Sequence, residues 1–146
     1  MEQKIQDFIN SRNIAVVGVS RSNMKFGSAA FRTLKNNGYQ VYPVHPTLPT
    51  FSGTRCYNEI KELPGEVDAL FVSVKPEKAE KVVTEAAERN IKRIWFQRGA
   101  DFSDAAQKAE ALGIECVTGK CLLMYAEPVK GIHAVHRFFV KLLGSL

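Results

Sequence analysis

The sequence has few cysteines and no long apolar run. Its three cysteines, Cys56, Cys116 and Cys121, form no Cys-x-x-Cys pair, and an odd number cannot all be bridged within one chain. This usage is typical of a reducing compartment, so we expect a cytoplasmic protein without structural disulfides. The longest apolar runs are far too short to cross a bilayer, and the N-terminal segment lacks the basic-then-apolar layout of a secretory signal. We therefore expect no membrane span.

The sequence also lacks any long block of basic residues, although its formal net charge is +5. The longest basic block is Lys92-Arg93, and no basic stripe carries interleaved aromatic residues. Nucleic acid is therefore not an expected partner. A few well-placed cations suffice for a phosphorylated small molecule, which fits this charge balance better.

Two features of an ordinary NAD site are missing. Ser20 stands where the second glycine of G-x-G-x-x-G would be, and residues 42–46, at the end of the second predicted strand, contain no acid. A nicotinamide dinucleotide site uses an Asp or Glu there to bind the ribose hydroxyls. The pattern favours a nucleotide other than NAD.

What the sequence does contain is an alternation of short apolar segments and helical patterns. The predicted strands are 14–17, 40–44, 68–74, 93–97 and 114–117, and the predicted helices are 5–9, 28–37, 58–62, 76–90 and 103–112. Strands that alternate with helices predict an α/β fold with a doubly wound, mainly parallel five-stranded sheet and flanking helices. We expect one domain over residues 1–146, with a core over about 12–121 and an added C-terminal helix over about 124–146.

The first predicted strand leads into a glycine-containing loop. Gly18-Val19-Ser20 follows the strand, and Gly27-Ser28 precedes the next helix. Backbone N–H groups in such a loop and the dipole of the helix favour an anion, so this loop predicts a phosphate site. The alternative is that Gly18 and Gly27 only allow close packing of helix and strand.

Small, cyclic or polar residues follow the predicted strands at one sheet edge. They are Gly18-Val19-Ser20, Val44-His45-Pro46, Val74-Lys75-Pro76 and Gln97-Arg98-Gly99. Ligands of open parallel sheets bind beyond the carboxyl ends of the strands, so a pocket is expected there.

Several of these segments together resemble a known family. The matching residues are 14–20, 41–46, 53–60, 63–68, 72–77, 94–99 and Cys121. In their order and spacing they are similar to the small stand-alone CoA-binding proteins, which resemble the nucleotide domain of the succinyl-CoA synthetase alpha subunit. The chain departs from that pattern at Leu122, where many relatives carry proline, and in its apolar C-terminal segment.

The resemblance implies a Rossmann-like fold with coenzyme A lying across the carboxyl edge of the sheet. It assigns phosphate binding to Gly18, Val19, Ser20, Gly27 and Ser28, with positive charge from Arg21, Lys25 and Arg55. It places His45 and Pro46 beside the nucleotide, Val74, Lys75 and Pro76 beneath the adenosine or pantetheine, and Gln97 and Gly99 along the pantetheine arm.

The function expected from this resemblance is a binding or regulatory module for CoA or an acyl-CoA, without a catalytic centre. Cys121 has no identifiable base, and the spacing of His133 and His136 with Cys121 and Glu127 matches no zinc pattern, so neither catalysis nor a metal is expected. One alternative is an NADP-dependent or acyl-transfer enzyme using the same site, with Lys25 or Arg55 meeting the 2′-phosphate. Another is a regulatory domain whose C-terminal helix docks on a second copy or a partner protein.

Overall fold

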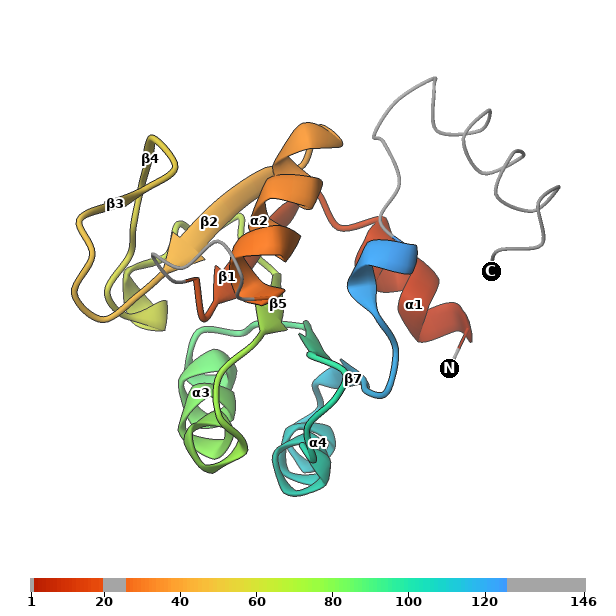
Figure 1. Cartoon of the computed structure of the whole chain (residues 1–146). Coiled ribbons are helices and arrows are strands. Elements are labelled where there is room, and N and C mark those ends of the chain that lie inside the picture. Colours follow the sequence, from red (N-terminus) through yellow and green to blue (C-terminus); the bar gives the residue numbers. More distant parts are fainter. Residues whose placement is uncertain (1, 20–25, 126–146) are drawn as a thin grey trace, which may run out of the picture.

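The fold is built on a parallel sheet of five strands (Figure 1). The structure, a computed structural model, describes residues 2–19 and 26–125. The strands of this sheet are β1 (Asn13–Val17), β2 (Gln40–Val44), β5 (Ala69–Val72), β6 (Arg93–Phe96) and β7 (Glu115–Val117). They lie in the order β2-β1-β5-β6-β7, and every neighbouring pair is parallel. The predicted α/β fold is confirmed.

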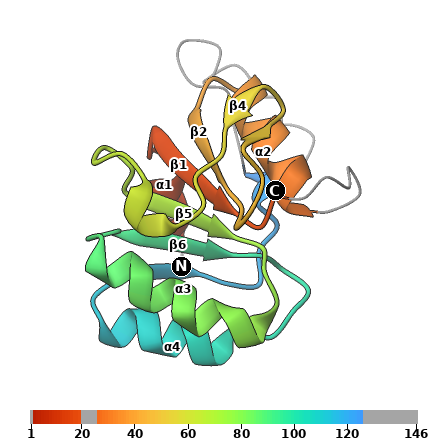
Figure 2. The same cartoon turned by 90° about the vertical axis from the view of Figure 1, so that its left-hand side faces the viewer.

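Helices cover both faces of the sheet (Figure 2). On one face lie α1 (Glu2–Ile9) and α2 (Phe26–Asn36), and on the other lie α3 (Pro76–Glu88) and α4 (Ser103–Ala111). Alternate residues of β1 face opposite layers, since Ile14 and Val16 pack with α1 and α2 while Ala15 and Val17 pack with α3 and α4. Both sets are buried, which explains the unbroken apolar runs of the strands.

The Pro-rich segment after β2 differs from expectation. The sequence predicts a loop there, but the structure has a small antiparallel hairpin of β3 (Thr50–Phe51) and β4 (Thr54–Arg55). Its two turn residues, Ser52 and Gly53, have φ angles of 51° and 76°, which suits a tight hairpin whose twist matches its strands. The expected helix at 58–62 is a single 3-10 turn, η1 (Ile60–Glu62).

The other boundaries shift by up to three residues, the largest shift being at α1, which begins at Glu2 where the sequence predicts residue 5. The third predicted strand, 68–74, is β5 and ends at Val72, because the chain then leaves the sheet and begins α3 at Pro76. The described chain ends with η2 (Leu122–Met124) and Tyr125, so the predicted C-terminal helix lies almost entirely outside the described residues. His133, His136 and Glu127 lie there too. No helix in the described ranges is long and apolar enough to cross a membrane.

Candidate functional site

The sheet reverses its strand order beside β1. From β1 the chain crosses through α2 to β2 on one side, and the next sheet strand, β5, pairs with β1 on its other side. The two crossover helices α2 and α3 cover opposite faces of the sheet. A reversal of this kind leaves a crevice beyond the carboxyl ends of the strands, here β1, β2 and β5. This is where ligands of doubly wound sheets bind.

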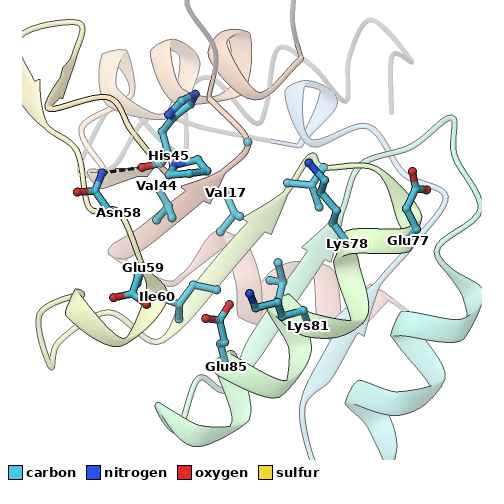
Figure 3. A pocket seen from close by; sticks show the side chains of 14 residues that line it. Val17, Val44, His45, Asn58, Glu59, Ile60, Glu77, Lys78, Lys81 and Glu85 are labelled. Carbon is cyan, nitrogen blue, oxygen red and sulfur yellow. Dashed lines mark hydrogen bonds between the residues drawn. The ribbon is translucent and has the colours of Figure 1, made fainter.

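A cavity of about 470 Å³ lies at this position, between the sheet, η1 and α3 (Figure 3). A cavity of this size is typical of a small-molecule site. Its lining residues are Val17, Gly18, Val44, His45, Pro46, Asn58, Glu59, Ile60, Val74, Glu77, Lys78, Lys81, Val82 and Glu85. Valine and isoleucine side chains form its apolar part, and charged side chains stand around them.

Four of the residues predicted from the sequence line this cavity: Gly18, His45, Pro46 and Val74. They come from three separate segments, which follow β1, β2 and β5. The expectation that these strand ends meet at one edge is consistent with the structure. Their role in binding remains a prediction.

Two glycines allow close approaches at the end of β1, Gly18 to the chain that follows β5 and Gly27 between α2 and β1. Gly18 has φ +113°, and a Cβ atom there would lie 2.3 Å from the carbonyl oxygen of Ser73. A Cβ atom on Gly27 would lie 2.3 Å from the carbonyl oxygen of Gly18. Both glycines therefore have a packing role, and the close approach at Gly27 brings the N-terminus of α2 next to Gly18, which lines the cavity. Val19, which follows Gly18, is a buried core residue, and Ser28, which follows Gly27, is fully buried within α2.

His45 is held in one orientation. Its Nδ1 accepts hydrogen bonds from the backbone N–H groups of Thr47 and Leu48, both at 3.1 Å. The Asn58 side-chain amide donates to the carbonyl oxygen of His45 at 2.8 Å, which ties the β2 end to the segment before η1. Because Nδ1 is an acceptor, the proton of the neutral imidazole lies on Nε2, which remains for a ligand.

Other predicted residues lie outside this lining. Arg55 is on the β3–β4 hairpin, with its guanidinium 4.7 Å from the centre of the Tyr57 ring. Lys75 and Pro76 form the start of α3, and Pro76 occupies its first turn. Gln97 donates a hydrogen bond to the Arg98 carbonyl, and Gly99 is exposed with φ +101°.

Three predicted residues, Ser20, Arg21 and Lys25, lie outside the described residues. The other residues outside the lining follow β5 or β6 or lie on the β3–β4 hairpin, near the carboxyl edge of the sheet but outside this cavity: Arg55, Lys75, Pro76, Gln97 and Gly99. Among the predicted cations within the described residues, Arg55 lies against an aromatic ring.

Sequence reasoning missed the polar and charged residues of the cavity that come from α3 and the segment before η1. They are Asn58, Glu59, Glu77, Lys78, Lys81 and Glu85. A signal was present, because Lys78, Lys81, Val82 and Glu85 are spaced by three and four residues and therefore share one face of the predicted helix. That this face turns towards η1 depends on tertiary packing.

The three cysteines are free and differ in accessibility. Cys56 and Cys116 are buried and Cys121 is half-buried. Burial raises the pKa of the Cys56 thiol, and burial with the nearby Glu110 charge raises the pKa of Cys116 to about 12. None of the three lines the cavity between η1 and α3.

We expect a thiol reagent to modify Cys121 first in the folded protein at pH 8. The thiolate is the reactive form, and both inaccessibility and a raised pKa protect the other two cysteines. Peptide mapping after brief alkylation measures this, with denatured protein as the control in which all three react. Early labelling of Cys116 would contradict the burial described here.

Comparison with known proteins agrees with this geometry. Residues 12–127 match the family described as CoA binding domain. The chain belongs to this family.

Members of the CoA binding domain family occur both within larger enzymes and as small proteins. The alpha subunit of an ADP-forming acetate–CoA ligase II from Pyrococcus furiosus is 35% identical over 88 residues, which is 60% of this chain but 19% of that subunit. The chain thus spans about a fifth of that relative's length.

Two solved structures of small proteins are similar over nearly their whole length. A conserved hypothetical protein from Pyrococcus furiosus has a TM-score of 0.72 and 35% identity, with 77% of this chain and 97% of that chain covered. A hypothetical protein from Pyrococcus horikoshii OT3 has a TM-score of 0.80 and 26% identity, with 90% and 93% covered. The Rossmann-like fold is shared with both.

Proposed function

We propose that this protein binds coenzyme A or an acyl-CoA at the carboxyl edge of its sheet, and that it acts as a binding or regulatory module. The observation that carries the proposal is the cavity at the reversal of strand order, where the close approach at Gly27 brings the N-terminus of α2 next to Gly18. Membership of the CoA binding domain family supports the choice of ligand.

The chemistry of the cavity favours one orientation of the bound CoA, with its phosphates near Gly18 and its adenosine in the apolar part. Phosphates belong at the Gly18 end, where the N-terminus of α2 favours an anion. The adenosine then extends into the apolar part formed by Val17, Val44, Ile60 and Val82, because a purine ring gains from burial against such side chains. His45 and Pro46 stand beside the nucleotide at the end of β2.

A role without catalysis is supported by the side chains at the cavity. His45 already uses Nδ1 in two backbone hydrogen bonds, and the described cysteines lie elsewhere. The ligase activity of the longer relatives belongs to proteins of which this chain matches a small part. The three free thiols fit the proposed cytoplasmic location.

Isothermal titration of ligand-stripped protein with CoA tests the proposal, with dephospho-CoA and NADP titrated in parallel. We expect saturable binding of CoA and a rise in melting temperature with millimolar CoA, because a ligand of the native state stabilises it. Weaker binding of dephospho-CoA would show that a cation binds the 3′-phosphate, and Lys25 or Arg55 is the predicted residue.

Two results would contradict the proposal. If CoA produced neither binding heat nor thermal stabilisation, CoA would not be a ligand of this protein. Binding of NADP alone, especially with turnover of a nicotinamide substrate, would instead support the enzymatic alternative.

A further inference from the structure

The cavity has two chemically different ends. The Gly18 end lies at the carboxyl edge of the sheet, next to the start of α3. The other end lies further along α3, where Lys81 and Glu85 stand roughly 8 and 14 Å from Pro76 at the rise of an α-helix. Apolar side chains, Val17 and Ile60 among them, lie between the two ends (Figure 3).

Lys81 and Glu85 present a donor beside an acceptor. They are four residues apart on α3, so their side chains share one face, and both line the cavity. In Figure 3 both side chains extend from α3 on the side of the helix that faces the cavity. In the described part of the chain no hydrogen bond or salt bridge engages either side chain.

The order of this pair contributes little to the stability of the helix. A glutamate that precedes a lysine by four residues stabilises a helix better than the reverse order, and here the lysine comes first. Both polar groups therefore remain available to a ligand at the end of an apolar cavity.

We infer that Lys81 and Glu85 determine specificity for adenine, an inference that rests on the proposed binding of CoA. With the phosphates at Gly18, the purine ring occupies the apolar middle of the cavity and directs one polar edge towards this pair. Adenine carries an amino donor at N6 next to a ring-nitrogen acceptor, N7 on one edge and N1 on the other. Glu85 accepts from N6 and Lys81 donates to the neighbouring ring nitrogen.

The same pair disfavours a 6-oxopurine. Guanine and hypoxanthine carry an oxygen acceptor at position 6, which would face the Glu85 carboxylate without a proton between them. A binding site rejects the wrong base when that base would leave a polar group of the site without a hydrogen-bond partner.

The charges around the cavity support a base rather than a phosphate at this end. At this end of the cavity two carboxylates, those of Glu59 and Glu85, accompany one ammonium group, that of Lys81. A phosphate dianion gains little beside this excess of negative charge, whereas an amino group gains a hydrogen bond to a carboxylate.

The test compares CoA with deamino-CoA, in which N6 is replaced by oxygen, by isothermal titration of the full chain. We expect the wild-type protein to bind CoA about tenfold more tightly, within the range of one bidentate base contact. In the double variant Lys81→Glu/Glu85→Lys, which keeps the net charge, we expect this preference to disappear or invert.

The matched control exchanges Glu88 and Lys92, an exposed pair with the same spacing that does not line this cavity. The variant Glu88→Lys/Lys92→Glu should keep the wild-type preference, and melting curves establish that both variants fold. Equal binding of the two ligands by the wild type, or an unchanged preference in the Lys81/Glu85 variant, overturns this inference alone. Failure of the wild type to bind CoA at all overturns the proposed function, and this inference with it.

Discussion

Replacing Gly18 with alanine is expected to lower the free energy of unfolding by about 2–5 kcal/mol and to abolish CoA binding. Two costs add at this residue. The φ of +113° is unfavourable for any residue with a Cβ atom, and the new methyl group would lie 2.3 Å from the Ser73 carbonyl oxygen of the adjacent strand. Relief of that contact requires separation of the ends of β1 and β5, which also displaces the cavity. Urea unfolding and CoA titration measure the two effects.

Substitutions at three other glycines measure the cost of the steric contact and the cost of the strained φ angle separately. Gly27→Ala introduces a backbone contact of 2.3 Å at a residue whose φ is not in the left-handed region, and Gly99→Ala introduces strain at φ +101° with open space around the Cβ. Gly65→Ala introduces neither. We expect Gly18→Ala to be the most destabilising of the four and Gly65→Ala to be nearly neutral. Equal stability of the Gly18 and Gly65 variants would contradict the close approach of β1 and β5.

Replacing Trp95 with alanine is expected to cost about 3–5 kcal/mol of stability, in the range for a large aromatic residue removed from a core. Trp95 is fully buried on β6. Its ring lies edge-on to Phe8 of α1, with centroids 5.3 Å apart, and 5.8 Å from the ring of Tyr125. Its Nε1 donates to the Lys120 carbonyl at 2.9 Å. One side chain thus holds α1 and the last described segment against the sheet.

Trp95→Phe is the matched control for this substitution. It keeps an aromatic ring against Phe8 but leaves the Lys120 carbonyl without its donor, so we expect a loss of roughly 1–2 kcal/mol. Urea unfolding followed by circular dichroism compares the variants, because the sequence has only one tryptophan and its fluorescence is lost in both. A cost for Trp95→Ala no larger than that for Trp95→Phe would show that the ring does not anchor these elements.

These residues show how far the sequence predicts the fold. The five parallel strands follow from short apolar runs such as β1, because strands covered by helices on both faces need apolar residues on both sides. The hairpin at residues 50–55 was not predicted, since its strands are two residues long and carry no alternating pattern.

The candidate site, like the fold, was predicted from the sequence only in part. The sequence alone determined the α/β fold and the strand ends at Gly18, His45, Pro46 and Val74, because parallel strands bring their carboxyl ends to one edge whatever the packing around them. Only the tertiary structure decided that Arg55 lies against Tyr57 outside the cavity and that Lys81 and Glu85 line it. A helical period identifies which residues share a face, but the direction of that face is set by the neighbour against which the helix packs. For α3 one such neighbour is η1. Arg89, directly after α3, donates hydrogen bonds from Nη2 to the carbonyl oxygens of Leu63 and Pro64, directly after η1.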